Sequence, residues 1–208
     1  MLPPEVALPF FGIAVLLALA PGPDNLFVLM QSAMWGRNAG LWVVLGLCTG
    51  LIGHTLAVAV GLAAVFAASA TAFLVVKLIG AAYLLYLAWG ALRAGASARS
   101  GARPPRQTAT QLYRRGIIMN LTNPKVSIFF LAFLPQFASP ARGSIGLQMA
   151  MLGGLFMLAT LLVFGAVALF SGAIGERLQQ SARAQVWLNR LAGVVFIGMA
   201  ARLLVTPR

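Results

Sequence analysis

The sequence carries very little charge, and almost all of it is of one sign. Of its 208 residues, 9% are Asp, Glu, Lys or Arg, with three acidic residues against fifteen basic ones. Soluble domains usually carry about 25% charged residues. Two long stretches, 38–76 and 143–175, contain none of the four types. Because a membrane-spanning helix needs roughly 20 apolar residues, we expect a polytopic membrane protein.

Cysteine and histidine occur once each, as Cys48 and His54. A single cysteine excludes an intrachain disulfide and a Cys-x-x-Cys redox pair. A metal site needs several carboxylate, thiolate or imidazole ligands, and an intramembrane enzyme needs a nucleophile with its base. The apolar runs offer Asp24, His54 and little else, so we expect no metal, no cofactor and no enzyme activity.

Nucleotide and nucleic-acid chemistry are also disfavoured. No Gly-x-x-x-x-Gly-Lys-Ser/Thr loop occurs, so direct use of a nucleotide has no support. The formal net charge of +12 comes from arginines confined to the segments between apolar runs. Since no basic surface interleaved with aromatic residues is present to stack bases, no nucleic-acid partner is expected, and the partner surface is membrane lipid.

Six apolar runs predict six transmembrane helices in one transmembrane domain covering residues 1–208. A segment rich in Ala, Ser, Gly, Pro and Arg at 94–113 is typical of a flexible aqueous loop. It separates a first half, about 1–93, from a second half, about 114–208. The expected spans are 6–35, 39–68, 71–93, 115–138, 144–173 and 186–205.

The distribution of arginine predicts the orientation. With six spans, the loops 1–2, 3–4 and 5–6 share one side and hold ten arginines, whereas the other side holds three. Lys77 and Lys125 lie within spans and complete the fifteen basic residues. Loops rich in arginine and lysine stay in the cytoplasm. The loop 94–113 is therefore expected in the cytoplasm and both termini outside it.

Proline interrupts the first and fourth runs, in "PGPDN" (21–25) and "NPK" (123–125). Proline lacks an N–H and clashes with the preceding turn, so carbonyls upstream lose their partners. Within a membrane, protein or a water-filled cavity must satisfy them. We therefore expect broken helices and a polar pocket; the alternative is a pair of kinks that only shape packing. The residues expected at the breaks are Pro21, Gly22, Pro23 and Pro124.

The two interruptions occupy corresponding positions in the two halves. When Pro23 is aligned with Pro124, Asp24 falls opposite Lys125. An odd number of spans in each half makes the halves inverted relative to each other, and interrupted helices at matching positions mark the transport site of such proteins. The expected fold is all-α, with two inverted three-helix repeats.

Asp24 and Lys125 are the charged side chains expected deep in the membrane, where charges are expensive and usually paired or functional. Deep side chains of opposite charge suit a zwitterionic ligand, because Lys125 and the N–H groups of a broken helix would receive its carboxylate. Asp24 and the upstream carbonyls would receive its ammonium. The alternative is a structural ion pair that locks the breaks together. Neutral hydrogen bonds would come from Asn25, Asn120 and Asn123.

His54 is expected near the centre of the second span, within a stripe of small residues at spacings of three to four. Such stripes let membrane helices approach closely, which explains the glycines but not the imidazole. The small residues exceed what six helices require, which leaves a homodimer open beside internal packing. The stripe consists of Gly46, Gly50, Ala57 and Gly61.

Three stretches resemble the lysine exporter (LysE/RhtB) family of amino-acid efflux proteins. They are "APGPDNLFVLMQSAMWGRNAGLWVVLGLCTGLIGHTLAVAVGLAAV" (20–65), "KLIGAAYLLYLAWGALR" (77–93) and "GIIMNLTNPKVSIFFLAFLPQF" (116–137). The last two spans match only in hydropathy and length.

The resemblance implies a secondary transporter of the bacterial inner membrane that exports amino acids, driven by the proton gradient. For such a transporter, Asp24 is the first candidate for the proton carrier, and His54 is the reserve. The PGPDN variant is more similar to the branch that handles neutral amino acids such as homoserine, threonine or leucine. Export of basic amino acids, or of divalent metal ions, remains as an alternative.

Overall fold

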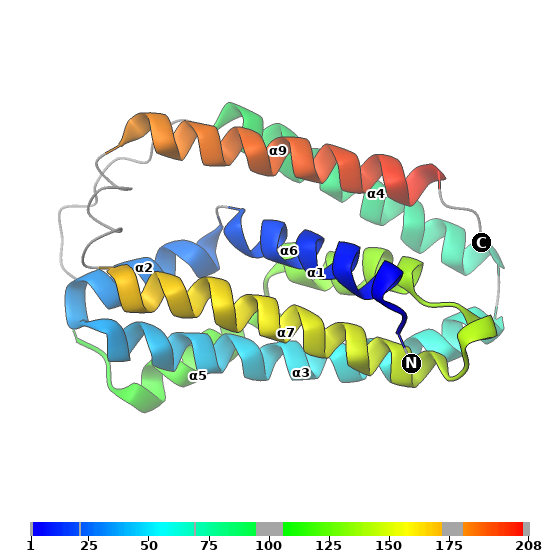
Figure 1. The fold of residues 1–208 in the computed structure, drawn as a ribbon, viewed down its shortest axis with the longest axis horizontal. Helices are drawn as coiled ribbons and strands as arrows, with labels where there is room; N and C mark the ends of the chain where they lie inside the picture. The colour runs from blue at the N-terminus through cyan, green and yellow to red at the C-terminus, as the bar shows by residue number, and fades with distance from the viewer. Residues whose placement is uncertain (1, 21, 69, 95–105, 172–180, 206–208) are drawn as a thin grey trace.

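The structure, a computed structural model, describes residues 2–20, 22–68, 70–94, 106–171 and 181–205. Its regular elements in these ranges are all helical and include no strand, which confirms the all-α class. The α-helices are α1 (Pro4–Leu19), α2 (Pro23–Trp35), α3 (Arg37–Ala68), α4 (Ala70–Arg93), α5 (Ala109–Leu121), α6 (Pro124–Ile128), α7 (Ile145–Phe170) and α9 (Ala182–Val205) (Figure 1). The short elements are the π-helical turn η1 (Phe129–Phe133) and the 3₁₀ turns η2 (Leu134–Phe137) and η3 (Pro140–Arg142).

Two described helices are long and apolar enough to cross a membrane by themselves. They are the Arg37–Gly61 part of α3 and the whole of α7. Two bent pairs, α1 with α2 and α5 with the segment Pro124–Phe137, raise the number to four if each pair is one span. The apolar helices therefore support a membrane protein, while α4 and α9 cover the expected third and sixth spans as helices.

The first and fourth expected spans are broken where the prolines predict it. The bend is 62° between α1 and α2, and 48° between α5 and the segment that begins at Pro124. Pro23 and Pro124 each stand at the start of a new helix, where the missing N–H is not needed. Gly22 caps α2 with extended backbone. Pro21 lies outside the described residues.

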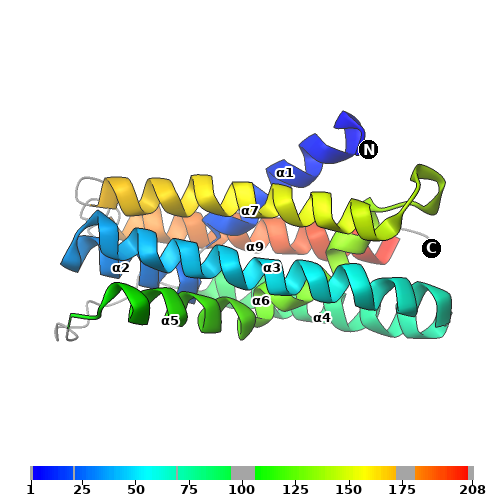
Figure 2. The same cartoon turned by 90° about the horizontal axis from the view of Figure 1, so that it is seen from below.

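Long helices pack lengthwise around the two breaks. α3 packs against α5 and α7, and α7 packs against α1 and α2. α4 and α9 lie side by side as a separate pair (Figures 1 and 2). α4 also contacts α6 and η1, whereas α9 contacts α1 and η1. The main apolar core is rich in phenylalanine. Its rings stack between α1, η1, η2 and α7, as Phe10, Phe129, Phe130, Phe133, Phe137 and Phe156.

Glycine brings α3 into direct contact with α5. A Cβ added at Gly46 would collide with the backbone oxygen of Tyr113. One added at Gly50 would lie 2.7 Å from the Cβ of Asn120. Because no side chain separates the two backbones, the end of α5 is held against the middle of α3, as small-residue stripes allow.

The small-residue stripe predicted on α3 reaches this interface only in part. Its first half packs on α5 and ends at His54, which contacts the end of that helix. Ala57 is exposed, and nothing lies within 4 Å of a Cβ added at Gly61. Close helix packing is therefore confirmed for Gly46 and Gly50, whereas Ala57 and Gly61 lie beyond the contact with α5.

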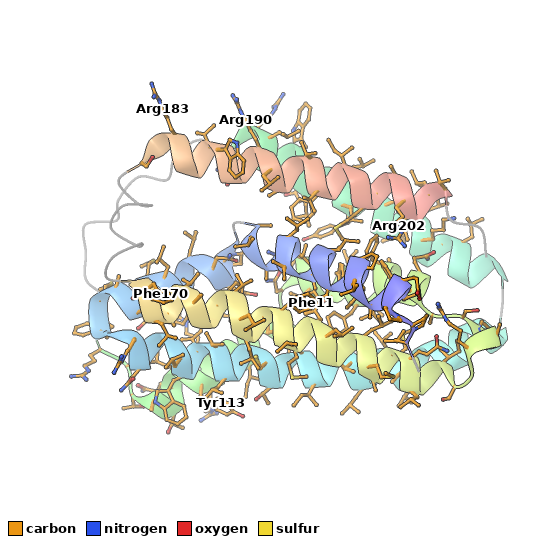
Figure 3. All side chains as sticks on the ribbon, viewed as in Figure 1. Phe11, Tyr113, Phe170, Arg183, Arg190 and Arg202 are labelled. Atoms are coloured by element: carbon orange, nitrogen blue, oxygen red, sulfur yellow. The ribbon has the colours of Figure 1, made fainter. Side chains whose placement is uncertain are left out.

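Apart from the two breaks, the long helices begin and end at two opposite ends of the molecule (Figures 1 and 2). α1 begins and α9 ends at one of them, whereas α2 and α7 end and α3, α5 and α9 begin at the other. The arginine side chains of α9 point in different directions near its two ends. Arg183 and Arg190 point outward near its start, and Arg202 near its end points toward the bundle, 4.3 Å from the centroid of the Phe137 ring (Figure 3).

Candidate functional site

The side chain of Lys125 closes the broken end of α1. Its Nζ donates to Leu17 O at 3.3 Å and to Ala20 O at 3.2 Å. In an unbroken helix Leu17 O would accept from residue 21, but Pro21 has no N–H. A cation is also favoured at a helix C-terminus by the helix dipole. Lys125 therefore replaces the donor that the proline removes.

Gly22 leaves space for that ammonium group. A Cβ built on Gly22 would lie 3.2 Å from Lys125 Nζ, which is tighter than ordinary van der Waals contact. The backbone of Gly22 is extended, with φ −171°, a conformation that any residue adopts. Space for Lys125, rather than backbone freedom, is therefore the physical reason for a glycine at this position.

The amide of Asn123 links the two breaks. Its Nδ2 donates to Asp24 Oδ2 at 2.8 Å, and its Oδ1 accepts from the backbone N–H of Lys125 at 3.0 Å as the N-cap of α6. Asp24 lies in the first turn of α2, where the helix dipole favours an anion. In the described part of the chain, Asp24 and Lys125 make no hydrogen bond to each other, so the breaks are joined through Asn123 instead of a direct ion pair.

His54 contacts a backbone carbonyl at the second break, as Lys125 does at the first. Its Nε2 lies 3.2 Å from Asn120 O and donates to it, since a carbonyl oxygen only accepts. In an unbroken helix Asn120 O would accept from residue 124, which is proline and has no N–H. In the structure it accepts from the backbone N–H of Asn123 at 3.1 Å in addition to His54. In both halves, the carbonyl four residues before a proline thus contacts a side chain from another helix that is able to carry a proton.

Asn25 completes the polar contacts at the first break. Its Nδ2 donates to Ala18 O at 2.6 Å, a further carbonyl near the C-terminal end of α1. Three of the last four carbonyls before the break, those of Leu17, Ala18 and Ala20, therefore accept hydrogen bonds from side chains. The break is stabilised by protein groups at the depth where membrane-embedded backbone needs them.

A cavity of about 20 Å³ lies where the two breaks meet. Asp24, Asn120 and Lys125 supply its polar wall, from α2, α5 and α6. Within the described part of the chain, Asp24 Oδ1 and Asn120 Oδ1 are buried and accept no hydrogen bond. A buried acceptor without a partner costs about 1–3 kcal/mol, so these two oxygens suit a ligand that donates hydrogen bonds. The remaining lining residues are Leu17, Ala18, Val126, Phe156, Thr160 and Phe164.

The structure brings the residues singled out from the sequence to one junction. Of the six predicted polar side chains, three line the cavity, and the other three contact the carbonyls or carboxylate beside it. The α7 wall, Phe156, Thr160 and Phe164, is new. A signal for it was present, because these residues are four apart and Thr160 is the one polar side chain in 149–170.

Fold and site together define a helical membrane protein in which two interrupted helices meet at a buried polar cavity, the arrangement of a transporter. Residues 15–206 match the family of LysE type translocators, and the chain belongs to that family. The resemblance of the sequence motifs is thereby confirmed, and it extends over the last two spans as well.

Curated relatives match over nearly their whole length. A Vibrio cholerae protein named as an uncharacterized membrane protein is 32% identical over 195 residues, 93% of this chain and 94% of its own. A leucine efflux protein of an Enterobacter species is 30% identical, covering 91% of this chain and 90% of its own. A homoserine/homoserine lactone efflux protein of Salmonella typhimurium is also 30% identical, covering 91% of each. No solved structure matches the chain.

Proposed function

We propose that this translocator exports neutral amino acids from the cytoplasm across the bacterial inner membrane in exchange for protons. The observation that carries the proposal is the junction of the two breaks, where a buried carboxylate from one and a buried ammonium from the other line one cavity. Relatives of 30% identity that are named for efflux of leucine and of homoserine support amino acids as the substrate class.

The junction holds the groups that a zwitterion needs. Asp24 Oδ1 and Asn120 Oδ1 are free to accept from a substrate ammonium. When that ammonium also takes the place of Lys125 Nζ on the α1 carbonyls, Lys125 becomes available to the substrate carboxylate. A basic side chain would add a second cation, and Asp24 is the one acidic residue inside the expected spans. This charge balance favours neutral substrates over lysine or arginine.

Divalent metal ions are a poorer fit. Among the described residues, no three His, Cys, Asp or Glu side chains gather closely enough to hold a metal ion. Metals of this kind require several such ligands. Asp24 beside an ammonium group and two amides matches an organic zwitterion better.

Transport requires the junction to open from the state described. The cavity of about 20 Å³ is the size of one water molecule and is too small for an amino acid. The 62° and 48° bends are the places where α1 can move relative to α2, and α5 relative to the segment that follows it. We propose that these half-helices move to admit substrate from each side in turn.

The proposal includes six spans in two inverted repeats. The first repeat consists of α1 with α2, then α3 and α4, and the second of α5 with α6, then α7 and α9. A twofold axis that exchanges the repeats converts the packing of α3 on α5 into that of α7 on α1 and α2. It leaves the pairs α3 with α7 and α4 with α9 unchanged. Contacts of all these kinds are present, which supports the repeat.

Orientation is tested by thiol labelling in a Cys48→Ala background. Thr110→Cys lies at the end where α5 begins, and Ala141→Cys lies in η3 near the other end; both positions are exposed. We expect an impermeant maleimide to label Ala141→Cys in intact cells and Thr110→Cys only after permeabilisation. Labelling of Thr110→Cys in intact cells would show that the proposed orientation is wrong, and the proposed direction of transport would be reversed with it.

The function itself is tested by export from cells. Cells that overproduce the protein and are loaded with homoserine, threonine, leucine, lysine or arginine are expected to release the neutral amino acids faster than empty-vector cells, and to tolerate their toxic analogues. The control is tolerance of toxic divalent metals, which should not change. Release of lysine and arginine alone would replace the neutral substrate by a basic one, and metal tolerance without amino-acid release would reject the proposal.

A further inference from the structure

Thr160 is a buried residue whose hydroxyl donates to no acceptor among the described residues. Its residue is 3% exposed. Thr49, Thr55 and Thr122 each donate to the carbonyl four residues earlier, the usual solution for a threonine in a membrane helix. Within the described residues, Thr160 makes no such bond, although it lines the cavity at the two breaks. Its hydroxyl is therefore available to a ligand in the cavity.

The neighbours of Thr160 on this wall are aromatic. Phe156 and Phe164 lie one helical turn before and after it, so the three side chains share one face of α7. All three line the cavity, and none of them is charged. The charged and amide groups of the cavity come from α2, α5 and α6 instead. An amino acid whose ammonium and carboxylate are held by those helices has only its side chain left for the α7 wall.

We propose that Phe156, Thr160 and Phe164 form the subsite for the side chain of the substrate, and that Thr160 selects for a side-chain hydroxyl. The two rings pack on methylene groups, and the threonine pairs with the hydroxyl. This inference rests on the proposed function and makes it more specific, because it favours small hydroxy amino acids such as homoserine and threonine. A site built to pair with a substrate hydroxyl disfavours the analogue that lacks it, since a buried polar group then stays unpaired.

The test compares two substrates of nearly equal shape. Homoserine and norvaline differ by a terminal hydroxyl in place of a methyl group. Initial rates for both are measured in proteoliposomes for the wild type and for Thr160→Val, which replaces the hydroxyl by a methyl group. The matched control is Thr55→Val, because Thr55 is also buried but donates to Leu51 O and does not line the cavity. We expect the homoserine-to-norvaline ratio to fall about tenfold in Thr160→Val, the effect of one neutral hydrogen bond, and to stay unchanged in Thr55→Val.

Two further variants keep the test decisive. If Thr160→Val does not reach the membrane, Thr160→Ala also removes the hydroxyl and should lower the same ratio, whereas Thr160→Ser should preserve it. An unchanged ratio in a variant without the hydroxyl overturns the subsite while leaving amino-acid export intact. Equal losses for both substrates also overturn it, because Thr160 would then serve the shared part of the substrate. A wild-type protein that transports neither of these amino acids nor leucine contradicts the proposed function itself.

Discussion

Lys125→Gln is expected to lower amino-acid export at least tenfold while the protein still reaches the membrane. The amide keeps an N–H donor for the α1 carbonyls but loses the positive charge that would pair with the substrate carboxylate. A hydrogen bond to a charged group contributes about 1.5–3 kcal/mol, which corresponds to a tenfold or larger change in rate. The measurement is the initial rate of export divided by the amount of protein in the membrane.

Lys125→Met separates the structural role of this side chain from its role in transport. It leaves Leu17 O and Ala20 O without the donor they have now, so the amount of folded protein is expected to fall below that of Lys125→Gln. Lys77→Gln removes the same charge from α4 and should keep full export, because Lys77 does not line the cavity. Export by Lys125→Gln at the wild-type rate would reduce Lys125 to a cap for α1.

The location of the breaks was predictable from the sequence because proline chemistry is local. A missing N–H at residues 21 and 124 removes the partner of the carbonyl four residues earlier, which identifies Leu17 and Asn120. The side chains that contact these two carbonyls were not identifiable in this way. Lys125 and His54 reach these carbonyls only because α6 lies against the end of α1 and α3 lies against the end of α5. Such contacts depend on tertiary packing.

The role of Asn123 shows a second limit of the sequence. Its position beside Pro124 suggested a neutral hydrogen bond to substrate. In the structure its amide is used at both ends, toward Asp24 and toward the backbone of Lys125. The prediction that Asn123 binds substrate remains a proposal, and the more direct consequence of its geometry is that it holds the two breaks together. Among the described residues at the breaks, Asp24 Oδ1, Asn25 Oδ1 and Asn120 Oδ1 are buried acceptors without a hydrogen bond.

The α7 wall shows a third limit. In a helix that is apolar on all sides, hydropathy gives the span but not the face that turns inward. The side of α7 that carries Thr160 faces the junction because α7 packs on α1, α2 and α3 together. A lone threonine in an apolar run is a weak signal in sequence. It becomes informative once the structure shows that its hydroxyl bonds to no carbonyl of the described residues and that Thr160 lines a cavity.

Asp24→Asn is expected to abolish proton-driven accumulation of substrate while leaving exchange of substrate intact. The introduced amide has nearly the size of the carboxylate, and its oxygen can still accept from Asn123 Nδ2, so the link between the breaks is retained. It cannot gain or lose a proton. If Asp24 is ionised against the substrate ammonium and becomes protonated after release outside, only the step that returns the empty transporter with a proton is lost.

The measurement uses proteoliposomes with an acidic lumen, in which an amino-acid/proton antiporter accumulates external substrate. The wild type should concentrate homoserine or leucine in the lumen, and Asp24→Asn should only equilibrate it while still exchanging labelled for unlabelled substrate. His54→Gln is the matched variant at the other break, because its amide can still donate to Asn120 O. It should retain accumulation. The reverse pattern is accumulation by Asp24→Asn and loss of accumulation in His54→Gln. It would assign the role of proton carrier to His54 and leave Asp24 only the role of binding the substrate ammonium.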